Sequence, residues 1–379
     1  MINLFYDVVF YVGSKTLLAL LSIGTFFDRI RLWLWAHAFV AGITFYSCTR
    51  RARMSHNNAV AGRGTLTIVD NPDFPAMEFF EPGREFKIRV RHATAAYMDD
   101  AMLLVRSASI KFADETWESP FDLEMNTGNV TFFWNAFTFM QFAFRRDEKK
   151  GTEYQSYYQK FGRGRVGARA GFRRNPDSYV NCTFRSQTPF CLEAKDGSRY
   201  LVKWLLEPAD GTAESGIVSP ESVTTPAQLA DQNILPGETR NRNYLKNELR
   251  ERVGNGGAAY KLRMQLHSAN PEDVLPGTWN SNAEWNEENA PIYDLATISL
   301  DEILDHEETW WTSFWIGHLP ACITRPPARN LHDPNSLIYF RYRALTAIRV
   351  RWLFGKLFGV PKSWPDEGGP ARNAKIPGG

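Results

Sequence analysis

The 379-residue sequence has little of several features that would assign it to a class. Its four cysteines are scattered, with no C-x-x-C pair and no histidines at zinc-ligand spacing, so neither a disulfide framework nor a structural metal site is expected. The 44 basic residues exceed the 42 acidic ones by only two, which argues against a nucleic acid as partner. With 44% apolar and 23% charged residues, the chain is expected to be globular, with one large domain or two ordinary ones.

The sequence also lacks a charge-free apolar run of about 20 residues, the length that crosses a bilayer. Residues 4–46 are apolar almost throughout, but they are interrupted by Asp7, Lys15, Asp28, Arg29 and Arg31. The start, MINLFYD, has no basic region of the kind that opens a signal peptide, so we expect the segment to be retained. We predict that residues 1–46 form a helical segment, separable from the folded domain, that spans or lies in a bilayer or packs on another protein.

Aromatic residues are abundant, at 14% of the chain with 12 tryptophans. Five tryptophans occur late in the sequence near basic residues: Trp310, Trp311, Trp315, Trp352 and Trp364. This pattern is typical of a membrane boundary, and it is also typical of tryptophans buried between a barrel and its helices.

From residue 63 onward, short segments alternate apolar and polar residues, which predicts strands. The predicted strands are 65–69, 85–90, 102–112, 129–134, 179–186 and 200–206. We therefore expect an α+β fold, with a mostly antiparallel barrel over residues 63 to about 206 and helices over 243–360 packed against it.

The expected domain organisation follows from composition. Residues 47–62 are expected to be a linker and 63–360 one domain, followed by a tail at 361–379. Residues 209–241 are rich in Gly, Ser, Thr, Pro and Ala and are expected to form a long loop. The segment 145–174 has many basic residues and the run GRGRVGARAG, so it is expected to be a loop or arm.

Several motifs, taken in chain order, resemble those of the haem catalase superfamily. Arg89–Ala93 resembles its R-x-x-H-A strand, Arg106–Phe112 its R-G-x-A-x-K-F strand, and Phe121–Gly128 its D-L-x-x-N-x-T segment before two phenylalanines. Ser186–Phe190 and Tyr200–Trp204 resemble the pair S-Q-x-P-F and Y-x-x-K-(F/W). No single motif is specific, and the collinear set carries the resemblance. Smaller relatives in this superfamily include allene oxide synthases, which act on fatty-acid hydroperoxides.

The resemblance implies a catalase-like barrel and a site on it. His92 would be the distal histidine and Asn126 its partner, while Arg89 and Arg106 stand where haem propionates are bound. In such a site, an imidazole moves a proton between peroxide oxygens, an amide holds the peroxide, and guanidinium groups bind carboxylates.

The iron-ligand side departs from the family pattern, in which a tyrosinate in an R-x-x-x-Y helix binds the metal. Aligning the family's R-x-R pair with Arg341 and Arg343 puts Ala347 in the tyrosine position, and counting from Arg341 alone puts Leu345 there. Neither side chain can ligate iron. Tyr342 takes the ligand position only in a register that lacks the activating arginine.

Two functions follow from this resemblance. In the first, the chain is a non-catalytic accessory subunit that has lost its haem, needs no cofactor or metal, and scaffolds a membrane complex with other subunits, attached through residues 1–46. A respiratory assembly of the mitochondrial inner membrane is the favoured location. In the alternative, the chain is a membrane-bound haem b enzyme that transforms fatty-acid hydroperoxides. The residues that would then serve are the catalytic His92 and Asn126 and the haem-binding Arg89, Arg106, Arg343 and Tyr342.

Overall fold

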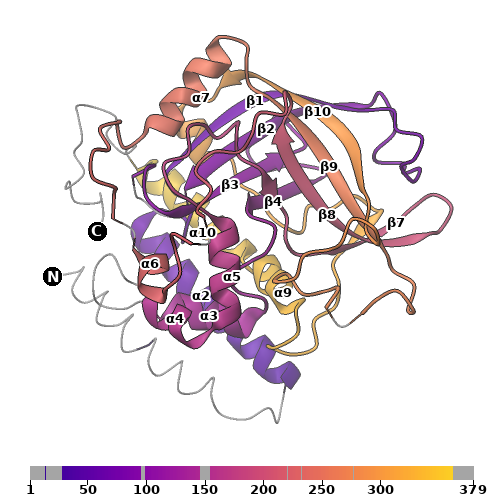
Figure 1. Ribbon diagram of the computed structural model, residues 1–379, viewed down its shortest axis with the longest axis horizontal. Helices are drawn as coiled ribbons and strands as arrows, with labels where there is room; N and C mark the ends of the chain where they lie inside the picture. The colour runs from indigo at the N-terminus through magenta and orange to yellow at the C-terminus, as the bar shows by residue number, and fades with distance from the viewer. Residues whose placement is uncertain are drawn as a thin grey trace.

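The computed structural model describes residues 13, 28–94, 99–145, 154–219, 221–231, 233–275 and 277–361. Its centre is a closed antiparallel barrel (Figure 1). The eight strands of the ring are β1 (Ala59–Ile68), β2 (Glu85–Thr94), β3 (Leu104–Lys111), β4 (Asp122–Thr127), β6 (Phe184–Arg185), β8 (Arg199–Pro208), β9 (Ala259–Ser268) and β10 (Ile292–Ile303). They pair in this order, and β10 closes the ring by pairing with β1.

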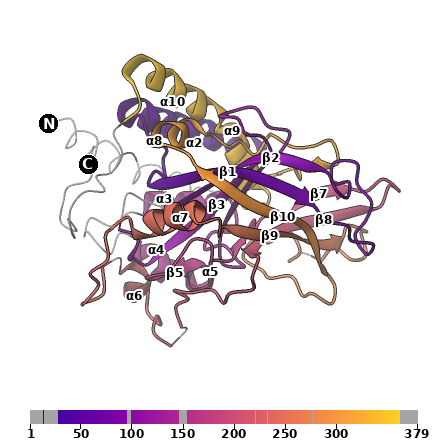
Figure 2. The same cartoon turned by 90° about the horizontal axis from the view of Figure 1, so that it is seen from above.

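Three short strands and nine helices surround the ring in the described part of the chain. The strands are β5 (Phe172–Arg173), β7 (Phe190–Glu193) and β11 (Ile323–Thr324). The helices are α2 (Asp28–Arg50), α3 (Ala136–Phe144), α4 (Gln155–Lys160), α5 (Gly162–Gly171), α6 (Pro226–Ala230), α7 (Tyr244–Gly254), α8 (His306–Trp311), α9 (Ser336–Arg343) and α10 (Leu345–Phe358). In Figure 2, α2 and α10 lie side by side along one flank of the barrel, with α9 next to them.

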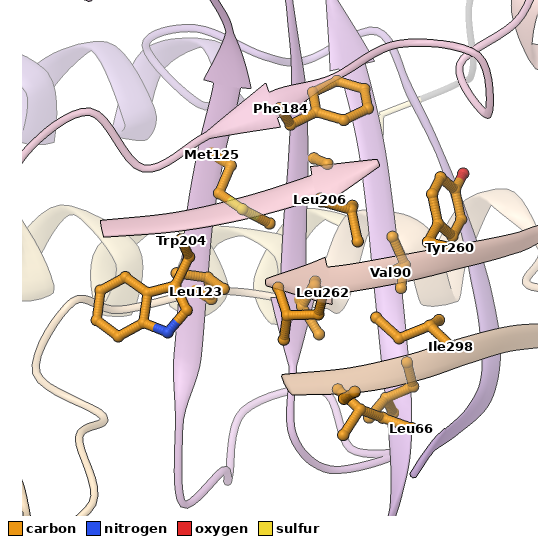
Figure 3. Close-up of a cluster of buried hydrophobic side chains, with 14 of the residues drawn as sticks. Leu66, Val90, Leu123, Met125, Phe184, Trp204, Leu206, Tyr260, Leu262 and Ile298 are labelled. Atoms are coloured by element: carbon orange, nitrogen blue, oxygen red, sulfur yellow. The ribbon is translucent and has the colours of Figure 1, made fainter. Parts of the chain in front are cut away.

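The barrel forms because alternate residues of its strands are apolar and point inward. In β1, Leu66 and Ile68 are buried while the intervening Thr65 and Thr67 are partly exposed. Figure 3 shows inward side chains from different strands meeting in one cluster, among them Leu66, Val90, Leu123, Met125, Phe184, Trp204, Leu206, Tyr260, Leu262 and Ile298. Burying each large side chain contributes about 1.5–3 kcal/mol, so this cluster is the main source of the fold's stability.

Strand β2 differs from β1 because both of its faces are buried. Every residue from Ile88 to Thr94 is buried. Helices and loops therefore cover its outer face, and polar residues on that face lie in the interior of the molecule. The candidate site is on this covered face.

The antiparallel barrel and the packed helices are confirmed, but the predicted end of the barrel at residue 206 is wrong. Strands β9 and β10 are needed to close the ring. The predicted strand at 129–134 is also wrong, because the chain leaves the sheet after β4. Gly128 has a φ of +90°, and a Cβ there would lie 2.6 Å from the carbonyl oxygen of Ala170. This glycine turns the chain away from the barrel, so the apolar run that follows packs between helices instead. Of the predicted strand 179–186, only Phe184–Arg185 pairs.

The basic segment 145–174 was predicted as a loop, yet its described residues, 145 and 154–174, include α4 and α5. Glycines make this packing possible, because they let α5 approach the chain after β4. A Cβ on Gly167 would lie 1.9 Å from the carbonyl oxygen of Thr131. Tertiary contact therefore overrides the low helix propensity of glycine.

The N-terminal segment was predicted to be separable from the domain, and the structure shows that its described half packs against the domain. Helix α2 buries Leu32, Ala36 and Val40, and two of these belong to a cluster with α3 and α9 that includes Phe340. The linker is therefore reduced to residues 51–58. Within the described residues, no helix is long and apolar enough to span a membrane. Residues 1–12 and 14–27 of the predicted membrane segment, the tail from 362 and Trp364 lie outside the described residues.

Candidate active site between the barrel and helix α9

The outer face of β2 and β4 presents polar side chains to the covering helices. On β4, Leu123 and Met125 point into the core, so Glu124 and Asn126 point outward. On β2, Val90 points inward and Arg91 outward. The register aligns Ser107 of β3 with Asn126. Strand alternation thus gathers a carboxylate, an amide and a guanidinium on one face, where Arg91 is buried and Glu124 and Asn126 are partly buried.

His56, in the short linker before β1, reaches this face. Its φ is +60°, a left-handed conformation that costs energy for a residue other than glycine. Ser55 Oγ lies 2.7 Å from Nδ1 of the His56 ring, and Arg91 Nη2 donates to the carbonyl oxygen of His56 at 2.9 Å. The Nε2 atom is buried, and the side chain of Asn126 faces the ring. Strained backbone and a buried ring beside polar groups are typical of a functional position.

The surroundings of His56 keep its imidazole neutral. Burial of the ring, followed by the charges of Arg91, Arg53 and Arg341, lowers the pKa of His56 to about 4, while Asn126 opposes the shift. At neutral pH the ring is therefore uncharged and able to accept a proton.

His92, the histidine that the resemblance selects, lies inside the barrel instead. It is fully buried, its Nε2 is 2.8 Å from the hydroxyl oxygen of Tyr260, and its ring stacks on Tyr179 at 5.0 Å. Burial lowers the pKa of His92 to about 3. His92 pairs with Ala108 and thus lies in register with Met125, so it faces away from Asn126. The structure does not bring His92 and Asn126 together. Strand β2 pairs with β3 without a register shift, so His92, two residues after Val90, points into the barrel as Val90 does, whereas Asn126 points outward.

The three arginines implied for haem binding do not converge either. Arg89 Nε donates to Asp114 Oδ1 at 2.6 Å and its Nη1 donates to Thr312 Oγ1 at 3.1 Å. Arg106 is fully buried and donates to the carbonyl oxygen of Asp100 at 2.6 Å. Arg343 is exposed. Each guanidinium is engaged in a different part of the molecule, so they do not form one carboxylate-binding set.

The α9 side contains no residue placed as the expected iron ligand. Ala347 is buried on α10, beyond a break in the helix at Ala344. Tyr342 stacks on Trp315 at 5.0 Å, with the guanidinium of Arg325 3.4 Å from its ring centroid. Arg341 forms an ion pair with Glu124 that joins α9 directly to β4. The residues present therefore do not fit a haem held in the way that the resemblance implies.

Two motif residues have a structural role that the sequence did not indicate. Lys111 and Asp122 form a fully buried ion pair, with Nζ 2.8 Å from Oδ1. His318 Nδ1 lies 2.7 Å from Asp122 Oδ2, and the backbone N–H of Trp315 donates to the same oxygen at 3.0 Å. This network ties β3 and β4 to the segment after α8. His56 was likewise missed, although Arg53 and His56 have the same R-x-x-H spacing as Arg89 and His92.

No protein-family model matches the chain. It is 32% identical over 301 residues to the allene oxide synthase-lipoxygenase protein of Plexaura homomalla, covering 78% of this chain and 28% of that protein. It is 29% identical over 355 residues to linolenate 9R-lipoxygenase of Nostoc sp., covering 88% of this chain and 43% of that protein. The chain thus spans less than half the length of either relative.

Among solved structures, a bacterial catalase superposes with a TM-score of 0.61 at 16% identity, covering 81% of this chain and 59% of that one. A fungal catalase gives a TM-score of 0.59 at 17% identity, covering 80% of this chain and 61% of that one. These similarities show that the barrel and its helices have the catalase-like fold.

Proposed function

We propose that the chain binds and transforms fatty-acid hydroperoxides at the site formed by His56 and Asn126. The observation behind the proposal is the neutral imidazole of the half-buried His56, whose buried Nε2 has no hydrogen-bond partner among the described residues and whose pKa is influenced by Asn126. The name of the relative from Plexaura, which includes allene oxide synthase, supports this substrate class.

The chain's own residues supply binding and proton handling in this proposal. The neutral ring of His56 can accept a hydrogen bond from the hydroperoxide O–H group and hold its proton. The Asn126 amide holds the peroxide by hydrogen bonds. The charges of Arg53 and Arg91, which already act on the His56 ring, attract the carboxylate of a fatty acid toward the site. The described residues do not fit a haem in the expected arrangement, so the proposed binding and proton handling involve the protein side chains alone.

A second candidate is a non-catalytic accessory protein of a membrane assembly, such as one of the mitochondrial inner membrane. The ion pair between Arg341 and Glu124 favours this candidate, because it closes α9 onto β4 where an active relative would need an open pocket. The lack of a ligating side chain at Leu345 and Ala347 favours it as well.

Hydroperoxide consumption by the purified full chain separates the two candidates. We expect the conjugated-diene absorbance of a fatty-acid hydroperoxide to fall, and we expect His56→Ala to slow this by about a hundredfold, the scale of a lost acid–base group. His306→Ala, an exposed histidine on α8, is the matched control and should consume substrate like the wild type. An inactive wild-type chain would support the accessory role, and an absorption spectrum of the same sample measures its haem content.

A further inference from the structure

Helices α2 and α10 expose an unusual amount of apolar surface. Seven of the twelve exposed large apolar side chains in the described part of the chain are on these two helices: Ile30, Trp33, Leu34, Phe45, Leu353, Leu357 and Phe358. Leu357 is 63% exposed and Ile30 is 55% exposed. A helix on the surface of a globular protein normally turns polar residues to the solvent, so a clustered apolar face indicates an interaction surface.

The exposed apolar residues of α2 lie on its outer face, and a different set of apolar residues on its inner face packs against the domain. In α2, Leu32, Ala36 and Val40 recur at intervals of four and are buried against the domain. Ile30 and Leu34 lie on the opposite side. Helices α2 and α10 pack against each other along one flank (Figure 2), so the exposed residues of both helices belong to neighbouring elements on that flank.

The charges on this two-helix face have one sign. Arg29 on α2 and Arg349 and Lys356 on α10 are exposed beside the apolar residues. Helix α10 contains no acidic residue, and the single acid of α2, Asp28, is its first residue and is partly buried. Apolar side chains next to cations, without exposed acids, match the acyl chains and phosphates of an anionic lipid surface.

We infer that the face formed by α2 and α10 docks on the surface of an anionic membrane. Its apolar side chains enter the headgroup boundary while its cations contact lipid phosphates. The indole ring of Trp33, half exposed on this face, suits the same boundary. The inference does not depend on the proposed function, since the face would bind lipid whether or not the His56 site is active.

Co-sedimentation of the full chain with lipid vesicles tests this inference. We expect the wild type to bind vesicles of phosphatidylcholine mixed with phosphatidylserine, to bind phosphatidylcholine alone more weakly, and to be released by salt. Two double variants, Leu34→Gln with Leu353→Gln and Arg349→Glu with Lys356→Glu, should each weaken binding about tenfold or more. Leu275→Gln and Lys261→Glu, at exposed positions elsewhere, are the matched controls and should bind like the wild type.

Three results would overturn the inference. The first is a folded wild-type chain, checked by circular dichroism, that binds neither kind of vesicle. The second is binding that both double variants retain, which would assign it to another part of the chain, such as residues 1–27. The third is a wild-type dimer, detected by light scattering, that the leucine variant dissociates, because the face would then be an interface between two copies.

Discussion

At the scale of single residues, the two buried histidines have the same charge state for different reasons. His92 is neutral because it is enclosed in the barrel core next to Tyr260. His56 is neutral because its buried ring is also surrounded by arginines. Only the second environment combines a strained backbone with polar groups on a covered face, and this difference is the reason for assigning the chemistry to His56.

The depressed pKa of His92 predicts a loss of stability in acid. The unfolded chain binds a proton at this residue below about pH 6.5, whereas the folded chain does so only near pH 3, so folding becomes less favourable as the pH falls between these values. Each such group contributes a slope of about 1.4 kcal/mol per pH unit. We expect His92→Phe to reduce the slope of unfolding free energy between pH 6 and 4.5 by about that amount, as measured by urea denaturation. An unchanged slope would mean that His92 is protonated in the folded state.

Breaking the Lys111–Asp122 pair should be costly, because it leaves a buried charge without its partner. We expect Asp122→Ala to lower the unfolding free energy by about 3–5 kcal/mol. The exposed pair between Lys195 and Glu81 provides the control, and Glu81→Ala should cost less than about 1 kcal/mol. Equal losses in the two variants would show that burial of the first pair has no special effect.

At the scale of elements, the sequence predicts the longer strands of the ring and fails where contacts from elsewhere in the chain decide the structure. The segments 85–90 and 200–206 lie within β2 and β8, and 65–69 overlaps β1 up to Ile68, because each contains apolar residues that face the core. The run 129–134 is equally apolar, yet Gly128 directs it out of the sheet. The same limit applies to the site. Asn126 was found from its motif, whereas His56 is brought to it only by the path of the linker.

Helix α5 depends on the absence of a side chain at Gly167, where a Cβ would collide with the backbone of Thr131. We expect Gly167→Ala to lower the unfolding free energy by about 1–3 kcal/mol in spite of the better helix propensity of alanine. Gly162→Ala is the matched control, since a Cβ there would meet only the Arg165 guanidinium at 3.5 Å. Thermal unfolding compares the two variants, and a stabilised Gly167→Ala would contradict the observed packing.

At the scale of the whole molecule, α2 joins the N-terminal region to the domain. Deleting residues 1–46 would remove the side chains that cover Phe340 and Met140, so we expect a destabilised and aggregation-prone product rather than a free barrel. Deleting residues 1–27 keeps α2 and should leave a cooperatively folding domain. Chemical denaturation of both truncated chains tests this. Two equally stable products would show that the folded domain does not need residues 28–46 and that the predicted boundary at residue 46 is correct.

The central claim is that a catalase-like barrel in this chain works through His56 rather than through the His92 of the family motif. The most direct test compares fatty-acid hydroperoxide consumption by the wild type, His56→Ala and His92→Phe, with folding of each variant confirmed by circular dichroism. We predict that His56→Ala loses consumption about a hundredfold and that folded His92→Phe stays within a few-fold of the wild type. The opposite ranking, with His92→Phe inactive and His56→Ala active, would contradict this account.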